Sequence, residues 1–148
     1  MSGIGEARPR LPSQSGTTLI EALVVVAITS MVALVGFPRM QQGLLTLAQR
    51  ETVSVVAARL RQARGEALRR DGPVVFAIGA DGRTYGTSGG VVTPTPSGVT
   101  LAADGSGRRI AFYGDGSSSG GVIWVRAARR AIAVAVAPLG GAVAAGAG

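Results

Sequence analysis

An apolar segment near the N-terminus constrains the fold of this chain more than any other feature. It runs from Thr17 to Phe37, and among its 21 residues Glu21 carries the one charged side chain. A helix of this length rises about 1.5 Å per residue and therefore spans the roughly 30 Å hydrocarbon layer of a bilayer. A carboxylate inside such a segment raises the free energy of insertion by about 3 kcal/mol. We therefore expect Glu21 to have a function and a partner.

The residues around this carboxylate form a pattern with a known parallel. Gly16-Thr17-Thr18-Leu19-Ile20-Glu21, followed by Pro38, resembles the class III leader and N-terminal helix of type IV pilins and pseudopilins. The resemblance implies that a prepilin peptidase cuts after Gly16 and methylates the new amino group of Thr17. It also implies that Glu21 pairs with the N-terminal ammonium of the subunit assembled before it, which sets the axial register of a filament. The family usually has Phe directly after the cut, where this chain has Thr17.

Two simpler interpretations of the N-terminus stay open. In a conventional secretory signal, Arg8 and Arg10 form the basic region and residues 22–37 the apolar core, but no A-x-A cleavage triplet follows the core. In a plain signal anchor there is no filament at all, and Arg39 and Arg50 on the far side of the segment weaken the positive-inside argument for orientation. The Gly-x-x-x-x-Glu spacing favours the pilin-type leader over both.

Beyond Pro38 a helical pattern continues to about Arg70. Apolar residues recur every three or four positions on one face and polar residues on the other: Val53, Val56, Leu60, Ala63 and Ala67 against Arg59, Gln62, Glu66 and Arg69. Glu66 stands four residues before Arg70, a spacing that favours an ion pair within the helix. Asp71-Gly72-Pro73 predicts the end of the helix. We expect Gly36, Pro38 and Gly43 to bend it where it leaves the membrane.

After the helix, the apolar residues alternate instead of following a helical period, which predicts strands. The expected strands are 74–78, 83–85, 99–102, 110–113, 122–127 and 131–137, with a short final strand near Val143. Asp81-Gly82 is a hairpin turn signal, because both residue types tolerate positive φ. Residues 91–98, which include two prolines, predict a loop. In the last long strand Ile132, Val134 and Val136 share one face, which we expect to be the core face.

The C-terminal half carries a second resemblance. The stretch 110–121, then Val122-Ile123-Trp124-Val125, then a strand ending in Pro138-Leu139-Gly140-Gly141, resembles the GspH/FimT domain. Together with residues 58–67 at the end of the helix, it is similar to the H-type minor pseudopilin of the type II secretion system. The resemblance implies an α+β fold, in which a long N-terminal helix, transmembrane and then amphipathic, packs on a C-terminal all-β domain of two sheets.

The expected organisation follows from these two resemblances. Its parts are a prepilin leader over 1–16, a transmembrane and assembly helix over 17–38, an amphipathic helix over 39–71 and a periplasmic β-rich domain over 72–148. Removing the leader leaves 132 residues, enough for one membrane helix and one small domain. The chain has no Cys, so packing and sheet hydrogen bonds must stabilise the domain without a disulfide.

Motifs that suggest chemistry have simpler explanations in this chain. Residues 116–120 fit the G-x-S-x-G nucleophile elbow, but the chain has no His to serve as a base, and the segment does not stand between a strand and a helix. The Asp-Gly pairs at 104–107 and 115–117 lack the spacing of a calcium loop. All three segments predict turns. We expect no catalytic residue, no metal site and no cofactor.

A formal net charge of +7 raises the question of nucleic acid. Five arginines of the C-terminal half are candidates for convergence at one end of a sheet: Arg108, Arg109, Arg126, Arg129 and Arg130. Aromatic residues are not interleaved with them, and the tail 142–148 carries no charge, so we do not expect nucleic acid as a partner. Solvated strand ends are the favoured interpretation. A contact patch of Arg126, Arg129 and Arg130 against acidic groups of a neighbouring subunit is the alternative.

The sequence therefore predicts an assembly protein and not an enzyme. As the resemblance implies, it is a single-pass inner-membrane protein whose N-terminus is cytoplasmic and whose C-terminal domain is periplasmic. Its expected partners are the prepilin peptidase/methyltransferase, the inner-membrane assembly platform, and other major and minor pseudopilins in a pseudopilus tip complex that exports folded proteins. The alternative is a FimT-like minor pilin of a type IV pilus, in pilus assembly or DNA uptake.

Overall fold

The structure, a computed structural model, describes residues 18–104 and 106–147. The chain divides into two compact units, Met1–Arg39 and Met40–Gly148, which are described separately. One helix, α1 (Leu19–Arg70, 52 residues), contributes to both units. All the strands belong to the second unit, which we call the head. The predicted leader lies outside the described residues.

Local sequence explains where α1 begins. Thr18 stands directly before the helix, and its side-chain Oγ1 accepts a hydrogen bond from the backbone N–H of Glu21 at 3.3 Å. A hydroxyl in this position satisfies one of the N–H groups that the first turn of a helix leaves without a partner. The helix then continues through Pro38 without interruption. The bend expected at Gly36, Pro38 and Gly43 therefore does not break the helix, and its angle stays a prediction.

The end of α1 is as predicted, with one difference in the residue that turns the chain. Asp71 adopts the left-handed conformation at φ 49°, and the backbone N–H of Gly72 donates to the carbonyl of Ala67 at 3.3 Å. This is the hydrogen bond of a Schellman cap, in which the residue after the helix is left-handed. The left-handed residue is Asp71, although glycine is the commoner choice at that place.

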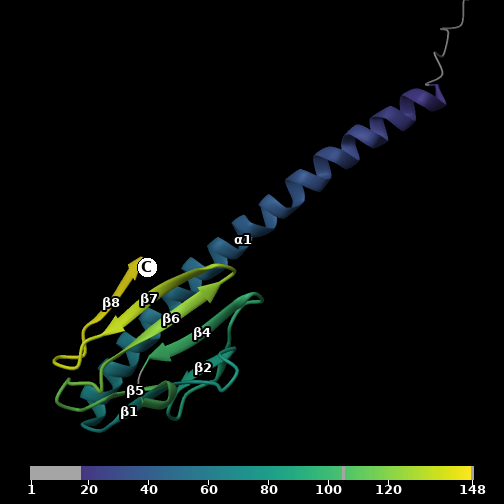
Figure 1. Cartoon of the computed structure of the whole chain (residues 1–148). Helices are drawn as coiled ribbons and strands as arrows, with labels where there is room; N and C mark the ends of the chain where they lie inside the picture. The colour runs from purple at the N-terminus through teal and green to yellow at the C-terminus, as the bar shows by residue number, and fades with distance from the viewer. Residues whose placement is uncertain (1–17, 105, 148) are drawn as a thin grey trace, which may run out of the picture. The chain divides into compact units, whose positions relative to one another are not determined.

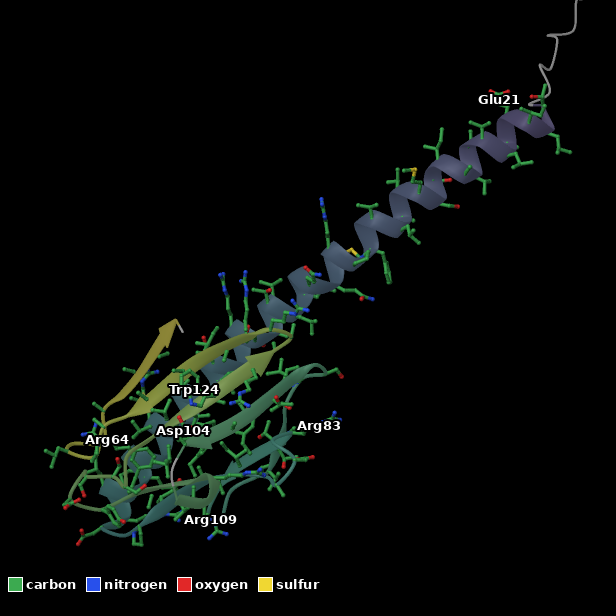
Figure 2. The ribbon with its side chains drawn as sticks, viewed as in Figure 1. Glu21, Arg64, Arg83, Asp104, Arg109 and Trp124 are labelled. Atoms are coloured by element: carbon green, nitrogen blue, oxygen red, sulfur yellow. The ribbon has the colours of Figure 1, made fainter. Side chains whose placement is uncertain are left out.

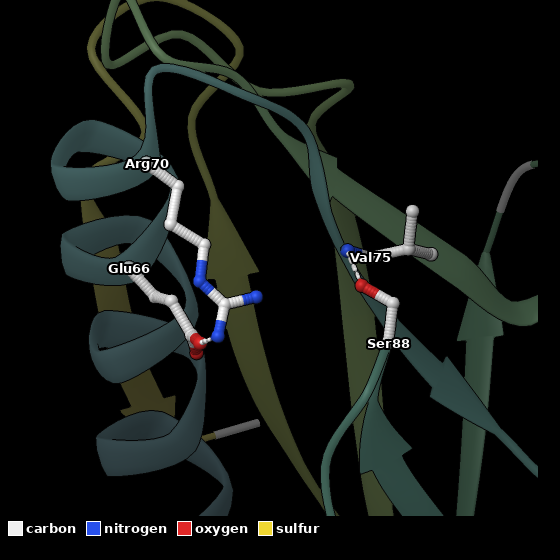
Figure 3. Close-up of polar contacts among 4 residues, drawn as sticks. All are labelled: Glu66, Arg70, Val75 and Ser88. Carbon is white, nitrogen blue, oxygen red and sulfur yellow. Dashed lines mark hydrogen bonds and ion pairs between the residues drawn. The ribbon is translucent and has the colours of Figure 1, made fainter.

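The face of α1 that the sequence predicted to be apolar is buried in the head. Eight helical residues are buried: Gln49, Thr52, Val53, Val56, Ala57, Leu60, Ala63 and Ala67. They include all five that the periodicity selected and add Ala57 and two polar residues, Gln49 and Thr52. The opposite face is open, and there the predicted pair of Glu66 with Arg70 forms at 2.6 Å (Figure 3). The prediction of an amphipathic helix is confirmed.

The strands of the head form two four-stranded antiparallel sheets (Figure 1). In spatial order the first holds β3 (Thr93–Pro94), β2 (Thr84–Thr87), β1 (Val74–Ile78) and β5 (Arg109–Phe112), and the second β4 (Val99–Asp104), β6 (Gly121–Ala127), β7 (Arg130–Val136) and β8 (Val143–Ala147). The 3₁₀ turn η1 (Ser106–Arg108) leads from β4 into β5, and so from one sheet to the other. Every predicted strand is present, with ends that differ from the prediction by at most two residues.

The prediction of an unbroken loop over 91–98 is wrong at Thr93 and Pro94. These residues pair with the neighbouring strand, Thr93 opposite Tyr85 and Pro94 opposite Thr84. Proline cannot donate to a ladder of hydrogen bonds, but it is tolerated in an edge strand, and β3 is the edge of its sheet. Whether these two residues form a strand therefore depends on their position at the edge of the sheet, which no local pattern reports.

The head has one hydrophobic core, made by the buried face of α1 and the inner faces of both sheets. Its largest fully buried side chains include Phe76 of β1 and Phe112 of β5. On β7, Val134 and Val136 are buried as predicted and Ile132 is partly buried against them. Directly after β2, the hydroxyl of Ser88 accepts a hydrogen bond from the backbone N–H of Val75 in β1 at 3.0 Å (Figure 3).

An aromatic pair lies at one border of this core. The rings of Phe76 and Tyr85 stack with their centroids 5.9 Å apart. Burial raises the pKa of the Tyr85 hydroxyl, because the phenolate is poorly solvated there, and the positive charge of Arg59 opposes the shift. The hydroxyl is therefore neutral under physiological conditions, and Tyr85 acts as a packing residue.

Candidate functional site

The first group of candidate residues stands at the start of α1. Gly16 and Thr17, the predicted cleavage and methylation positions, lie outside the described residues. Glu21 is in the first helical turn (Figure 2), and its side chain is exposed. Thr18 and Glu21 have the T-x-x-E spacing of a capping box, a role for Thr18 that the sequence analysis missed although the spacing was there to read. An acidic residue in a first turn also interacts favourably with the positive end of the helix dipole.

The helix around Glu21 presents apolar side chains in all directions. Twelve large apolar side chains between Leu19 and Phe37 are each at least 50% exposed. The polar side chains of Thr29 and Ser30 donate to backbone carbonyls one turn earlier, those of Val25 and Val26, at 2.6 and 2.7 Å. By length and composition this helix can cross a membrane. Within residues 18–38 as described, Glu21 is the one charged side chain, and it has no ion pair.

The second group comprises three arginines at one end of the second sheet. Arg126, Arg129 and Arg130 belong to the hairpin that joins β6 to β7, and all three are exposed. The pairing of Arg126 with Ala131 and of Ala127 with Arg130 brings them to the same tight turn. We call these three residues the hairpin patch.

The other two arginines considered with this patch lie elsewhere. Arg108 and Arg109 follow the end of β4 at Asp104, whereas the hairpin patch is beside its other end, at Val99. The guanidinium of Arg108 donates to the backbone carbonyls of Gly79 and Ala80, in the turn between β1 and β2. The five arginines considered from the sequence therefore do not converge at one end of a sheet, and the structure divides them into two groups.

A groove of about 410 Å³ runs beside the hairpin patch. Its walls are Gln42, Gly43, Leu45, Thr46 and Gln49 of α1 and residues 127–130 of the hairpin. Two positive side chains, Arg129 and Arg130, stand at its rim, and no acidic residue lines it. The groove can receive acidic groups.

One buried amide holds the helix and the hairpin together at this groove. Gln49 is 2% exposed, and its side-chain nitrogen Nε2 donates to the carbonyls of Val125, at 2.9 Å, and Arg130, at 3.1 Å. Sequence analysis missed this residue, because glutamine in a helical pattern usually marks the solvent face. The readable signal was its position, four residues before Val53 on the apolar face.

The serine-rich segment 116–120 is a structural turn, as predicted. Ser118 is buried, and its hydroxyl donates to the carbonyl of Ala137 at 2.9 Å, which ties the turn to the end of β7. Nearby, the hydroxyl and backbone N–H of Ser117 donate to the carboxylate of Asp115 at 2.6 and 2.9 Å, and these bonds lower the pKa of Asp115. Over the described part of the chain, no three His, Cys, Asp or Glu residues are grouped so that they could hold a metal ion.

Comparison with known proteins agrees with this arrangement. Residues 52–140 match the family described as Type II transport protein GspH. No curated protein sequence matches the chain.

Two crystal structures of the type IV minor pilin FimU from Pseudomonas aeruginosa have a similar fold. The first has a TM-score of 0.53 at 13% identity and covers 65% of this chain and 90% of its own. The second has a TM-score of 0.52 at 14% identity and covers 73% of this chain and 92% of its own. At this level of identity the likeness establishes the pilin-like α+β fold, a long helix packed on two antiparallel sheets.

Proposed function

Because the chain belongs to the family of the type II transport protein GspH, we propose that it is a minor pseudopilin of the type II secretion system. In this role it is a structural subunit of the periplasmic pseudopilus, near the tip, and it helps to export folded proteins across the outer membrane. The observation that carries the proposal is the combination of a GspH-type head with an apolar, exposed helix that holds a lone carboxylate. Subunits of this kind do their work through contacts and not through catalysis.

The proposed function gives Glu21 its partner. In lipid, the carboxylate pairs with the N-terminal ammonium of a neighbouring subunit, which is the methylated Thr17 once a prepilin peptidase has cut after Gly16. Two opposite charges that leave water together are far less costly than either alone, and removing one member of such a buried pair typically costs about 3 to 5 kcal/mol. The exposure of Glu21 in the single chain supports this role, because the carboxylate is free to meet a second molecule.

The same proposal fixes the topology. The N-terminus faces the cytoplasm, where the leader is removed, the first part of α1 crosses the inner membrane, and the head is periplasmic. The inner-membrane assembly platform then takes up the subunit and places it beside major and other minor pseudopilins. The apolar helix, long enough to cross a membrane, supports this arrangement.

The test compares three full-length variants in the native host, and it reads leader removal and incorporation into the pseudopilus separately. Gly16→Asp should block leader removal. Glu21→Ala should leave cleavage intact and lower incorporation by at least about 100-fold, the factor that corresponds to the loss of a buried ion pair. Glu51→Ala, which removes an exposed carboxylate from the head part of α1, is the control and should do neither. Normal secretion by uncleaved protein, or normal incorporation of Glu21→Ala, would contradict the proposal.

The second candidate is a minor pilin of a type IV pilus, and the likeness to FimU favours it specifically. The two candidates share the fold and the role of Glu21, so the phenotype of a deletion strain separates them. Loss of an exported protein with normal surface pili supports the pseudopilin. Loss of surface pili with normal export supports the pilin. A role in DNA uptake requires in addition that Arg129→Ala and Arg130→Ala weaken DNA binding more than Arg69→Ala does.

The intact mass of the membrane-extracted protein tests the remaining alternative, a signal-anchored module without a filament. A mature chain that begins at methylated Thr17 supports a filament subunit. A chain that keeps its first 16 residues supports the anchor.

A further inference from the structure

Arg64 of α1 lies beneath two turns of the head, the one at 113–117 and the one at 138–141 (Figure 2). A Cβ at position 141 would stand 3.1 Å from both Cδ and Nε of Arg64, and a Cβ at position 116 would stand 3.8 Å from Nη2. The carbonyl oxygen of Gly116, 2.9 Å from such a Cβ, and the Arg64 side chain together occupy the space that any side chain at position 141 would need. Gly141 makes room for both, and its positive φ of 57° is a second reason for glycine there.

The guanidinium of Arg64 has no partner among the residues that the structure describes. Its Nε is the one buried side-chain nitrogen or oxygen atom in the described chain without a hydrogen bond. The described chain also provides no ion pair for Arg64, since the pair of Glu66 with Arg70 is the one salt bridge present. A buried donor without an acceptor is unfavourable, and the great majority of such groups in native proteins are satisfied. The buried Nε is closed to solvent, so an acceptor from outside the chain would meet the terminal Nη1 and Nη2 groups of the guanidinium.

A pocket of about 270 Å³ opens at this place. It is lined by Arg61, Arg64, Gly65, Leu68, Gly141 and Val143. Two arginines line it and no acidic residue does, although most of the lining surface is apolar. The pocket therefore has positive side chains on its wall and no negative one to neutralise them.

Two of the acidic residues near this pocket in sequence are already engaged, and the carboxylate of a third, Asp71, lies beside Gly114 in the turn at 113–117. The carboxylate of Glu66 is paired with Arg70 at 2.6 Å. The carboxylate of Asp115 accepts two hydrogen bonds from Ser117, which lies in its own turn. Residues 40–148 as a whole carry twelve Arg against six Asp or Glu. The head thus has twice as many guanidinium groups as carboxylates, and no described carboxylate forms an ion pair with Arg64.

We propose that the pocket at Arg64 receives a carboxylate side chain from a neighbouring subunit of the filament. The planar guanidinium offers paired N–H donors that match a carboxylate in a bidentate arrangement, and a positive second side chain, Arg61, adds to the attraction at the entrance. The inference rests on the proposed function, because it takes the partner to be another pilin-like subunit. It adds a second point of contact, in the head, to the contact at Glu21.

The composition of the chain allows a direct test. The chain has no Lys, so Arg64→Lys introduces its one side-chain amine and keeps the positive charge. A zero-length carbodiimide crosslinker joins an amine to a carboxylate that is in contact with it. The variant is expressed at full length in the native host and treated in intact membranes, and mass spectrometry identifies the joined peptides. Arg69→Lys, which is exposed on the same helix and lines no part of the pocket, is the matched control.

We expect Arg64→Lys to give a crosslinked product several-fold more abundant than Arg69→Lys, joined to an Asp or Glu of a pilin-like subunit. A yield no higher than that of the control would overturn the inference. So would a crosslink to Glu66, Asp71 or Asp115 of the same chain, because the site would then be an internal ion pair.

A pair of glycine substitutions tests the geometry of the pocket. Added to Arg64→Lys, Gly141→Ala places a Cβ against the side chain at 64, whereas Gly140→Ala adds a Cβ at a similar positive φ of 76° with nothing within 4 Å. Both variants carry the backbone strain, and the first also crowds the side chain at 64 and the carbonyl oxygen of Gly116, which is 2.9 Å from the new Cβ. We expect Gly141→Ala to lower the crosslink yield several-fold and Gly140→Ala to leave it near that of the parent. Equal yields for the two would contradict the proposed pocket.

Incorporation of the same variants separates this inference from the proposed function. If Glu21→Ala abolishes incorporation while Arg64→Lys gives no specific crosslink, the proposed function stands and the pocket inference falls. If Glu21→Ala incorporates normally, or if the mature chain is never found in a filament, the proposed function itself fails.

Discussion

The two parts of α1 use similar apolar residues for opposite purposes. Between Leu19 and Arg39 every large apolar side chain is exposed, with Leu34 at 80%. Between Met40 and Arg70 apolar residues recur on one face, and Leu60 on that face is completely buried. A helix that is apolar on all sides needs an apolar environment all round it, whereas a helix with one apolar face needs a single surface to cover it. The comparison shows that the distribution of apolar residues around the helix, more than their number, determines whether a part of α1 suits a membrane or the surface of the head.

The largest expected difference between the two parts is in stability. Leu60→Ala should lower the free energy of unfolding of the head by about 2 to 5 kcal/mol, because it opens a cavity in a closely packed core. Leu34→Ala is the same chemical change in the same helix and should leave that free energy unchanged. Urea unfolding of the full chain in detergent, followed by the fluorescence of Trp124, measures both. Equal losses would show that the first part of α1 also belongs to the folded core.

Insertion into the membrane, in contrast to the stability of the head, should depend on the first part of α1 and not on the second. Val26→Arg places a charge near the middle of the apolar segment and should raise the free energy of insertion by about 2.5 to 3.5 kcal/mol. Val55→Arg, on the exposed face of the head part of the helix, should change the stability of the head by no more than about 0.5 kcal/mol. The fraction of each variant that resists alkaline extraction from membranes is the readout for insertion. Alkaline extraction of the parent chain itself would rule out a membrane-spanning segment.

Within the head, the contribution of a buried glutamine to stability can be compared with that of an exposed one. Gln49→Leu removes both hydrogen bonds to the β6–β7 hairpin and should cost about 1 to 3 kcal/mol, since two carbonyls then lose their donor. Gln42→Leu, seven residues earlier on the exposed surface, should be near neutral. Hydrogen exchange in the hairpin should rise in the first variant and not in the second. Unchanged exchange in Gln49→Leu would show that the hairpin is held by the core alone.

The smallest expected effect concerns the outer face of the second sheet. There the indole Nε1 of Trp124 donates to Oδ2 of Asp104 at 2.7 Å (Figure 2). Asp104→Ala should cost about 0.5 to 1.5 kcal/mol, and the fluorescence of Trp124, the single Trp of the chain, should respond. Asp104→Asn keeps an acceptor and should retain most of the parent spectrum. Identical spectra for Ala and Asn would mean that the hydrogen bond has no influence on the indole.

Local patterns were sufficient for most of the fold. The helix end at Asp71, the strand at 74–78 and the core face of β7 were all readable, because a helical or alternating period reports which side of an element is covered. The pairing of Thr93 and Pro94 was not readable, since it depends on Tyr85 and Thr84 being beside them. For the candidate sites, the T-x-x-E cap at Thr18 could have been found from spacing, but the separation of Arg108 from the hairpin patch could not.

What the sequence determined by itself is the identity of each element and the special character of one residue. An uninterrupted apolar segment, an amphipathic continuation and alternating strands follow from the order of residues, and Glu21 stands out because a charge among apolar neighbours is costly wherever that helix lies. The tertiary structure alone decided which distant residues meet: Gln49 with the carbonyls of Val125 and Arg130, and Arg64 with the turn at Gly141. Periodicity reports the environment on one side of an element, whereas such meetings depend on how the sheets and the helix pack, a property of the whole head that no short stretch of sequence contains.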